Sequence, residues 1–184
     1  KNILEAFNNF FIGNNAYKAG NFAKAKQYFE KSVQLNPQYA VAFNNLGLTY
    51  DKLKEYSSAI TNLETAIGLD DNYALAWNNL GVVYRHDNDF RKSIQSLMKA
   101  IKLKPGIAMY FYNLGLSCFY KGDYADAITH YQKTVELDKD HFDAYNNLGA
   151  VYSVMKNYYN VNEYFKKSTE INPSYSIAWD NLGY

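Results

Sequence analysis

The sequence has few of the features that indicate disulfide bonds, a membrane span or the binding of a polyanion. Its 184 residues include one cysteine, Cys118, so no disulfide can form within the chain. No stretch approaches the roughly 18 consecutive apolar residues that a membrane span needs. The 19 Lys and Arg against 18 Asp and Glu leave a formal net charge of +1, which gives no general attraction to nucleic acid or to an anionic membrane. We therefore expect no nucleic-acid partner and no membrane span.

Motifs of enzymatic and metal chemistry are also missing. The chain has no phosphate-binding loop, no zinc motif and no G-x-S-x-G nucleophile motif. Its three histidines, His86, His130 and His141, have no metal-ligand spacing. We expect no catalytic residue, no metal site and no cofactor, and hence no enzyme activity.

A repeat of constant length organises the sequence. Glycines recur every 34 residues, each preceded by a leucine or an apolar residue, with an aromatic residue four places before most of them. They are Gly13, Gly47, Gly81, Gly115, Gly149 and Gly183. The chain therefore divides into repeats 6–39, 40–73, 74–107, 108–141 and 142–175, with a partial repeat over 176–184.

Each repeat has the pattern of two helices. In 74–107, Trp77, Leu80, Gly81 and Tyr84 recur at the spacing of one helical face. The cluster Asp87-Asn88-Asp89 then indicates a turn. A second face follows over Phe90, Ile94, Leu97 and Ile101. The glycines Gly20 and Gly122 suit a left-handed helix end, and Asn21, Asp89, Asp123 and Asn157 are expected to cap the second helices. The fold class is therefore all-α.

This pattern resembles the tetratricopeptide repeat, whose signature is W-x2-L-G-x2-Y…A-x3-F…P. The match is carried by such sets as Trp77, Leu80, Gly81, Tyr84 and Pro105, and it covers nearly the whole chain. The resemblance implies one array over 1–184, an α-solenoid of helix-turn-helix repeats in a right-handed superhelix. It also implies a concave groove lined by the first helix of each repeat.

The resemblance assigns particular places of each first helix to that groove. The sixth place is a row of asparagines, and the fifth place is mostly asparagine as well. An amide side chain both donates and accepts hydrogen bonds, so a row of them can hold a peptide backbone whatever its side chains are. The amides assigned to the groove are Asn45, Asn79, Asn113, Asn147, Asn44, Asn78 and Asn146. The alternative is that the amides bond between neighbouring helices.

Apolar residues complete the predicted groove. They come from the second, fifth, ninth and last places of the first helices, and they are Leu75, Met109, Tyr112, Leu48, Val82, Leu116, Phe119 and Tyr120. We expect a peptide to place an apolar side chain against Met109, Leu116 and Tyr120. The alternative is that Phe119 and Tyr120 pack on the next repeat, because Cys118 stands where the signature has a tyrosine. A buried and inert thiol is expected for Cys118.

A clamp for a peptide's C-terminal carboxylate, as found in some tetratricopeptide domains, is not expected. Its five places fall on Phe10, Asn14, Asn45, Leu75 and Asn79. Both asparagines match, but all three cations that would form charge-assisted hydrogen bonds are absent.

The sequence thus predicts a protein-interaction scaffold that binds a peptide segment of a partner protein. One alternative is a structural array that forms homo-oligomers through exposed solenoid ends. Another is the substrate-recruiting arm of a larger enzyme, since the chain opens at Lys1 and ends within a repeat, as a piece of a longer protein would. We expect a cytoplasmic location.

Overall fold

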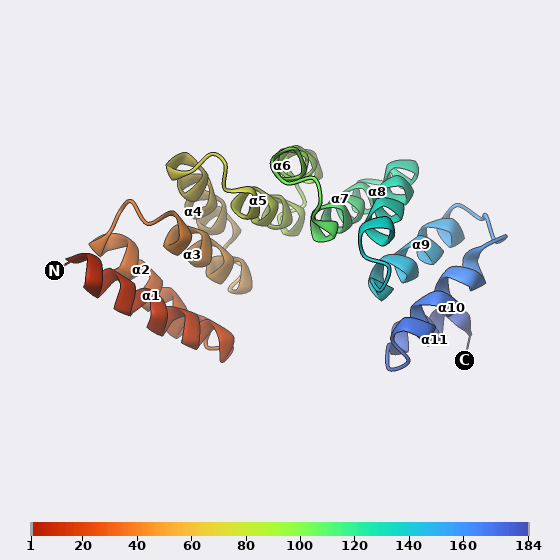
Figure 1. Ribbon diagram of the computed structural model, residues 1–184, viewed down its shortest axis with the longest axis horizontal. Coiled ribbons are helices and arrows are strands. Elements are labelled where there is room, and N and C mark those ends of the chain that lie inside the picture. The colour runs from red at the N-terminus through yellow and green to blue at the C-terminus, as the bar shows by residue number, and fades with distance from the viewer. Residues whose placement is uncertain (1, 184) are drawn as a thin grey trace. The chain divides into compact units, whose positions relative to one another are not determined.

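The structure, a computed structural model, describes residues 2–183, and every regular element in that range is an α-helix (Figure 1). The predicted all-α class is confirmed. The helices are α1 (Asn2–Lys18), α2 (Phe22–Leu35), α3 (Ala40–Lys52), α4 (Tyr56–Leu69), α5 (Ala74–His86), α6 (Phe90–Leu103), α7 (Ala108–Lys121), α8 (Tyr124–Leu137), α9 (Phe142–Val154), α10 (Val161–Ile171) and α11 (Ser176–Leu182).

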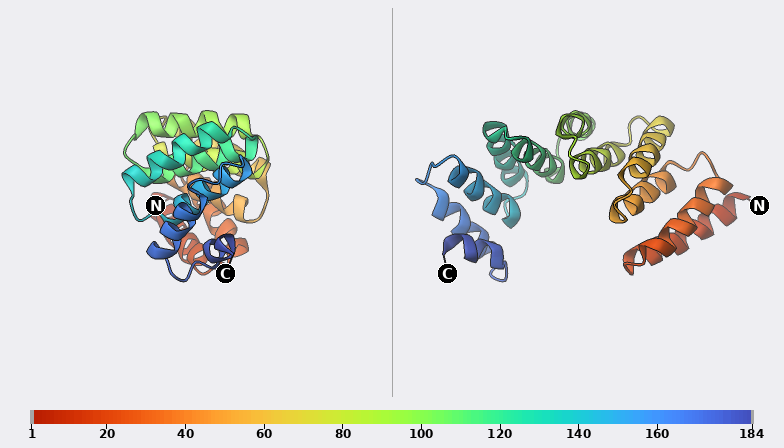
Figure 2. Two further views of the ribbon diagram at one scale, coloured as in Figure 1. Left: turned by 90° about the vertical axis from the view of Figure 1, so that its right-hand side faces the viewer. Right: turned by 180° about the vertical axis from the view of Figure 1, so that it is seen from behind.

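The chain forms two compact units, Lys1–Leu103 and Lys104–Tyr184. Within each unit, odd-numbered first helices pair with the even-numbered second helices that follow them, and each second helix packs on the next first helix (Figures 1 and 2). The first unit holds three such hairpins, α1–α2, α3–α4 and α5–α6. The second holds α7–α8 and α9–α10, followed by α11. This is the packing of an α-solenoid; that all of 1–184 forms a single array stays a prediction.

The repeated glycines lie where the two helices of each hairpin touch. A β-carbon at Gly81 would lie 2.6 Å from Cγ of Leu97, and one at Gly149 would lie 2.6 Å from Cε1 of Phe165. Those distances are shorter than any normal carbon–carbon contact, so the hairpin needs glycine there. The opposing side chains are large and buried, and they are Phe29, Leu63, Leu97, Tyr131 and Phe165. The 34-residue period is therefore the period of the core.

The turns inside the hairpins share one conformation despite their different residues. Gly20 and Gly122 have φ values of 74° and 93°, and Lys54, Asn88 and Lys156 have φ values of 61°, 64° and 57°. In each turn the next N–H donates to a carbonyl five residues earlier, for example from Asp89 to Tyr84 at 2.8 Å. Such a bond closes a left-handed helix end. The three non-glycine residues thus take the left-handed form as well, with the strain that it carries for a side chain.

The predicted helix caps are correct in two cases and wrong in others. Asn21 accepts from the Lys24 N–H, and Asp89 accepts from the Lys92 N–H, both at 3.0 Å. Asp123 makes no side-chain cap bond. Asn157 caps nothing because α10 begins only at Val161. Tyr158 and Tyr159 lie exposed in the turn before it, so no burial holds the missing first turn of α10 in place.

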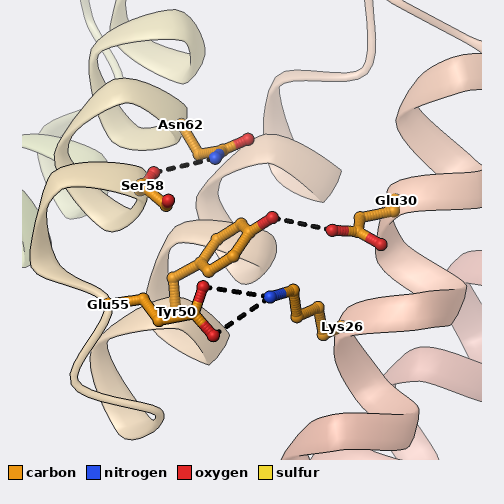
Figure 3. A network of polar contacts seen from close by, with 6 residues as sticks. All are labelled: Lys26, Glu30, Tyr50, Glu55, Ser58 and Asn62. Atoms are coloured by element: carbon orange, nitrogen blue, oxygen red, sulfur yellow. Dashed lines mark hydrogen bonds and ion pairs between the residues drawn. The ribbon is translucent and has the colours of Figure 1, made fainter.

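Tyrosines at the eleventh place of the first helices join successive hairpins. The Tyr50 hydroxyl of α3 donates to Glu30 of α2 at 2.7 Å, while Lys26 of α2 bonds Glu55 at 3.0 Å (Figure 3). The Tyr84 hydroxyl of α5 donates to Glu64 of α4 at 2.9 Å. Burial and then the bond to Glu64 raise the pKa of Tyr84 to about 12. Each tyrosine therefore stays a neutral donor across the physiological pH range.

Cys118 holds the same place in α7 and is buried, with 3% of its surface exposed. Burial, followed by the nearby Asp126 and Asp123, raises its pKa to about 11. We expect thiol labelling of the folded chain at pH 8 to be more than tenfold slower than that of the unfolded chain, because the reactive thiolate is scarce and shielded. The measurement is the labelling rate with iodoacetamide with and without denaturant. Equal rates would contradict the buried, inert thiol.

Candidate interaction groove

The asparagines of the first unit form a continuous chain of hydrogen bonds. Asn78 donates to Asn79 at 3.3 Å, and Asn79 donates across to Asn44 on the preceding first helix at 2.8 Å. Asn44 donates to Asn45 at 3.0 Å, and Asn45 donates across to Asn14 at 2.8 Å. The chain runs from α5 through α3 to α1. Each amide thereby satisfies polar atoms that packing removes from water.

This chain gives the fifth-place asparagines a role inside the protein. Asn44 is 1% exposed, and Asn78 and Asn146 are also buried. Their amides bond other asparagines, as Asn146 does when it accepts from Asn181 at 2.9 Å. The alternative raised by the sequence, bonding between neighbouring helices, therefore describes these residues. Asn79 is also buried, whereas Asn45, Asn113 and Asn147 are half-buried. Contact of any of them with a ligand stays a prediction.

The second unit differs at one point of the amide pattern. Asn147 donates to the hydroxyl of Tyr112, which takes the fifth place in α7, at 3.2 Å. Its oxygen, unlike those of Asn45 and Asn79, accepts no hydrogen bond from the described residues. The ring of Tyr112 packs on His141, with 4.6 Å between centroids. The second unit thus presents an amide oxygen that is open to a donor from outside.

An apolar pocket lies beside this amide. It has a volume of about 80 Å³ and is lined by Leu116, Phe119 and Tyr120 of α7, Tyr131 of α8, and Asn147 and Ala150 of α9. The ninth place of the first helices holds Asn14, Leu48, Val82 and Leu116 in the other repeats, and alanine in α9. The small side chain of Ala150 leaves the space that a leucine would fill.

The aromatic residues of this pocket are held in different ways. Phe119 is half-buried and packs on Tyr124 at the start of α8, with 5.7 Å between centroids. Tyr120 packs edge-on against Phe119 at 5.6 Å and keeps 60% of its surface exposed. Met109 is also exposed, at the other end of α7. In the first unit, Leu75 is exposed while Leu48 and Val82 are half-buried.

One contact was not predicted, although the resemblance assigns both of its residues to the groove. The carboxylate of Asp51, which is 8% exposed, lies 2.7 Å from Nδ1 of His86. Burial and then Asp51 raise the pKa of Tyr17, which lies on α1. Asp51 and His86 are 35 residues apart, the same separation as Asn44 and Asn79. An offset of 35 residues joins one position of a repeat to the following position of the next repeat. A search of the sequence for polar pairs at this offset would identify Asp51 and His86.

The structure also bears on two other features, a metal site and a membrane-spanning helix. Among residues 2–183, no three His, Cys, Asp or Glu side chains gather as metal ligands would. In the same range, no helix combines the length and apolar character that crossing a bilayer requires.

Comparison with known proteins identifies tetratricopeptide repeats along the chain. Family models described as tetratricopeptide repeat match residues 6–39, 28–61, 74–107 and 142–175, and one described as TPR repeat matches residues 52–87 and 115–153. A curated Pyropia yezoensis protein, ycf37, is 40% identical over 43 residues. That match spans only 23% of this chain and 24% of the relative.

Solved structures share the fold over nearly the full length of the chain. A MamA structure is 27% identical, covers 90% of this chain and 96% of its own, and has a TM-score of 0.79. Pseudomonas aeruginosa pilF, at 18% identity, covers 99% and 89% with a TM-score of 0.85. YrrB, described as a TPR protein with an unusual peptide-binding site, is 20% identical, covers 96% and 91%, and has a TM-score of 0.75. From its signature residues, its hairpin packing and these matches, the chain belongs to the tetratricopeptide repeat family.

Proposed function

We propose that the chain binds a peptide segment of a partner protein along the first helices of its second unit. Members of the tetratricopeptide repeat family are protein-interaction scaffolds and typically not catalysts. The observation that carries the proposal is the Ala150 pocket, an apolar recess with an open amide oxygen at its edge. A peptide can place an apolar side chain in the recess and donate a backbone N–H to Asn147.

The chemistry of the recess sets the expected preference. Its lining has no charged side chain, so the ligand gains from apolar burial and a neutral hydrogen bond. A volume of about 80 Å³ suits a branched aliphatic side chain of moderate size. The exposed ring of Tyr120 supplies further contact area at low entropic cost, as tyrosines do at many interfaces. YrrB shows that the fold occurs in a protein described as having a peptide-binding site.

The test begins with selection of a binding peptide from a displayed library against the folded chain. Ala150→Leu is then expected to weaken binding by tenfold or more, because the larger side chain would occupy the recess. Tyr120→Ala is expected to have a similar effect through lost apolar contact. Affinity should change little with salt, since no ion pair is involved. The measurement is the dissociation constant by fluorescence anisotropy.

Tyr159→Ala is the matched control, since Tyr159 is 92% exposed in the turn before α10. It removes the same aromatic group from the same unit and should leave affinity unchanged. If Ala150→Leu and Tyr120→Ala both fold and bind the selected peptide as tightly as the parent, the pocket is not the binding site.

A further inference from the structure

A second groove lies within the first unit. It lies between α4, α5 and α6 and has a volume of about 550 Å³. Its floor consists of Ile67, Leu80 and Tyr84, all of which are largely buried, and Trp77 forms one wall. The indole of Trp77 is fixed by a bond from Nε1 to the Asp71 carbonyl at 3.1 Å. We call this the α4–α6 groove.

A small residue lies in the wall of this groove. Its wall on α6 includes Ser96, whose hydroxyl donates back to the Lys92 carbonyl at 3.0 Å. Every other repeat has a larger side chain at this place. They are Tyr28, Asn62, His130 and Tyr164, of which Asn62 appears in Figure 3, donating to the Ser58 carbonyl.

The second unit shows what this place accommodates. There the Tyr164 ring stacks on Tyr152, with 5.5 Å between centroids and 5° between the ring planes. Tyr84 is the equivalent of Tyr152, two repeats earlier, and Ser96 is the equivalent of Tyr164. Serine has no ring to stack on Tyr84. In the first unit the flexible side chain of Lys92, and not a ring of α6, lies over Tyr84. An aromatic side chain from a ligand can take the position that Tyr164 has on Tyr152 if Lys92 moves aside.

The charge around this space is one-sided. α6 carries Arg91, Lys92, Lys99 and Lys102 and no carboxylate. The Nζ of Lys92 lies 5.2 Å from the Tyr84 ring centroid, and that of Lys99 lies 5.9 Å from the Trp77 ring centroid. Lys92 also pairs with Asp89 at 3.3 Å. The opposite wall has one carboxylate, Glu64, which accepts from the Tyr84 hydroxyl.

We propose that the α4–α6 groove binds an acidic peptide segment that inserts an aromatic side chain over Tyr84 and sets its carboxylates against Lys92 and Lys99. The apolar floor provides burial for the ring, and the lysines provide charge complementarity. A nucleic acid or an anionic membrane fits less well, because the apolar floor is recessed between helices and suits an inserted side chain. This site lies in the first unit and is independent of the Ala150 pocket.

The experiment uses a short synthetic peptide with a central phenylalanine flanked by glutamates, labelled for fluorescence anisotropy. Two companion probes replace the phenylalanine with alanine or the glutamates with lysines. The acidic phenylalanine peptide is expected to bind at low salt and to weaken steeply as salt rises. The companion probes are expected to bind at least tenfold more weakly. Phosphatidylserine vesicles and a single-stranded oligonucleotide test the other polyanions.

Two variants place the binding in this groove. Ser96→Tyr supplies the missing ring and should reduce affinity at least tenfold, while Lys99→Glu reverses the charge of the rim and should do the same. Lys31→Glu is the matched control, because Lys31 holds the place of Lys99 in α2, and it should leave affinity unchanged. Because Lys99 lies at the surface, this pair remains informative even if Ser96→Tyr fails to fold.

Three results would overturn the proposal. One is equal affinity of the parent, Lys99→Glu and Lys31→Glu for the acidic peptide. Another is equal binding of the alanine and phenylalanine probes, which would leave only unspecific charge attraction. The third is binding of vesicles or oligonucleotide that Lys99→Glu abolishes, without binding of the acidic peptide. Loss of binding in the Ala150→Leu variant bears only on the other pocket, so the two proposals fail separately.

Discussion

Gly81→Leu is expected to lower the free energy of unfolding of the first unit by about 3 kcal/mol, the upper end of the usual range for overpacking. The added β-carbon alone would lie 2.6 Å from Cγ of Leu97 and 3.0 Å from the Ser93 carbonyl oxygen. The carbonyl belongs to the helix backbone and cannot rotate away, so α5 and α6 must separate. Denaturant unfolding followed by circular dichroism measures the loss.

Gly68→Leu is the control for this change. Gly68 lies on α4 with nothing within 4 Å of its would-be β-carbon, and replacing a helical glycine gains up to about 1 kcal/mol of helix propensity. This variant should be as stable as the parent or more so. If Gly81→Leu and Gly68→Leu unfold at the same denaturant concentration, Gly81 is not required for the close packing of α5 on α6.

Phe29→Ala is expected to cost about 3–5 kcal/mol, the usual range for removing a buried aromatic ring. The ring is fully buried between α1 and α2, where it faces Gly13 and lies 5.7 Å from the Phe10 centroid. Glycine cannot fill the cavity that the ring leaves. The measurement is the midpoint and slope of the unfolding transition of the first unit.

Phe11→Ala supplies the comparison for this prediction. Phe11 is in the same hairpin but 66% exposed, so its removal should change stability by less than about 0.5 kcal/mol. Equal losses for Phe29→Ala and Phe11→Ala would mean that burial in the hairpin does not determine its stability.

The fold was predictable because the same contact between two helices recurs in every repeat. One glycine in a helix says little, but glycines at a constant period, each with a large residue 16 places later, define a contact that recurs in every hairpin. The turns were harder to predict. Asn88 is of a residue type that tolerates a left-handed backbone, but Lys54 and Lys156 are not, and only their position in the repeat indicates it.

The candidate site was less predictable, because its features depend on what surrounds each side chain. The sequence identifies a row of asparagines, but burial decides that Asn44 bonds Asn79 within the protein. Each of the two pockets has in its lining a side chain that is smaller than most of its equivalents, Ala150 in one and Ser96 in the other. Alignment of the repeats with one another shows both exceptions. The volumes and walls of the pockets required the structure.

The amide chain of the first unit also has a geometric consequence for any surface built on these hairpins. If two helices shift along one another by a turn, their apolar side chains can still bury a similar area. A buried amide that loses its partner in the same shift is destabilising, because it has given up its hydrogen bonds to water and gained none in return. The hydrogen bonds from Asn79 to Asn44 and from Asn45 to Asn14 therefore hold neighbouring first helices in one register. They fix how far each first helix is advanced along its neighbour. The spacing between side chains that a partner meets on successive helices is set by the protein's own interior.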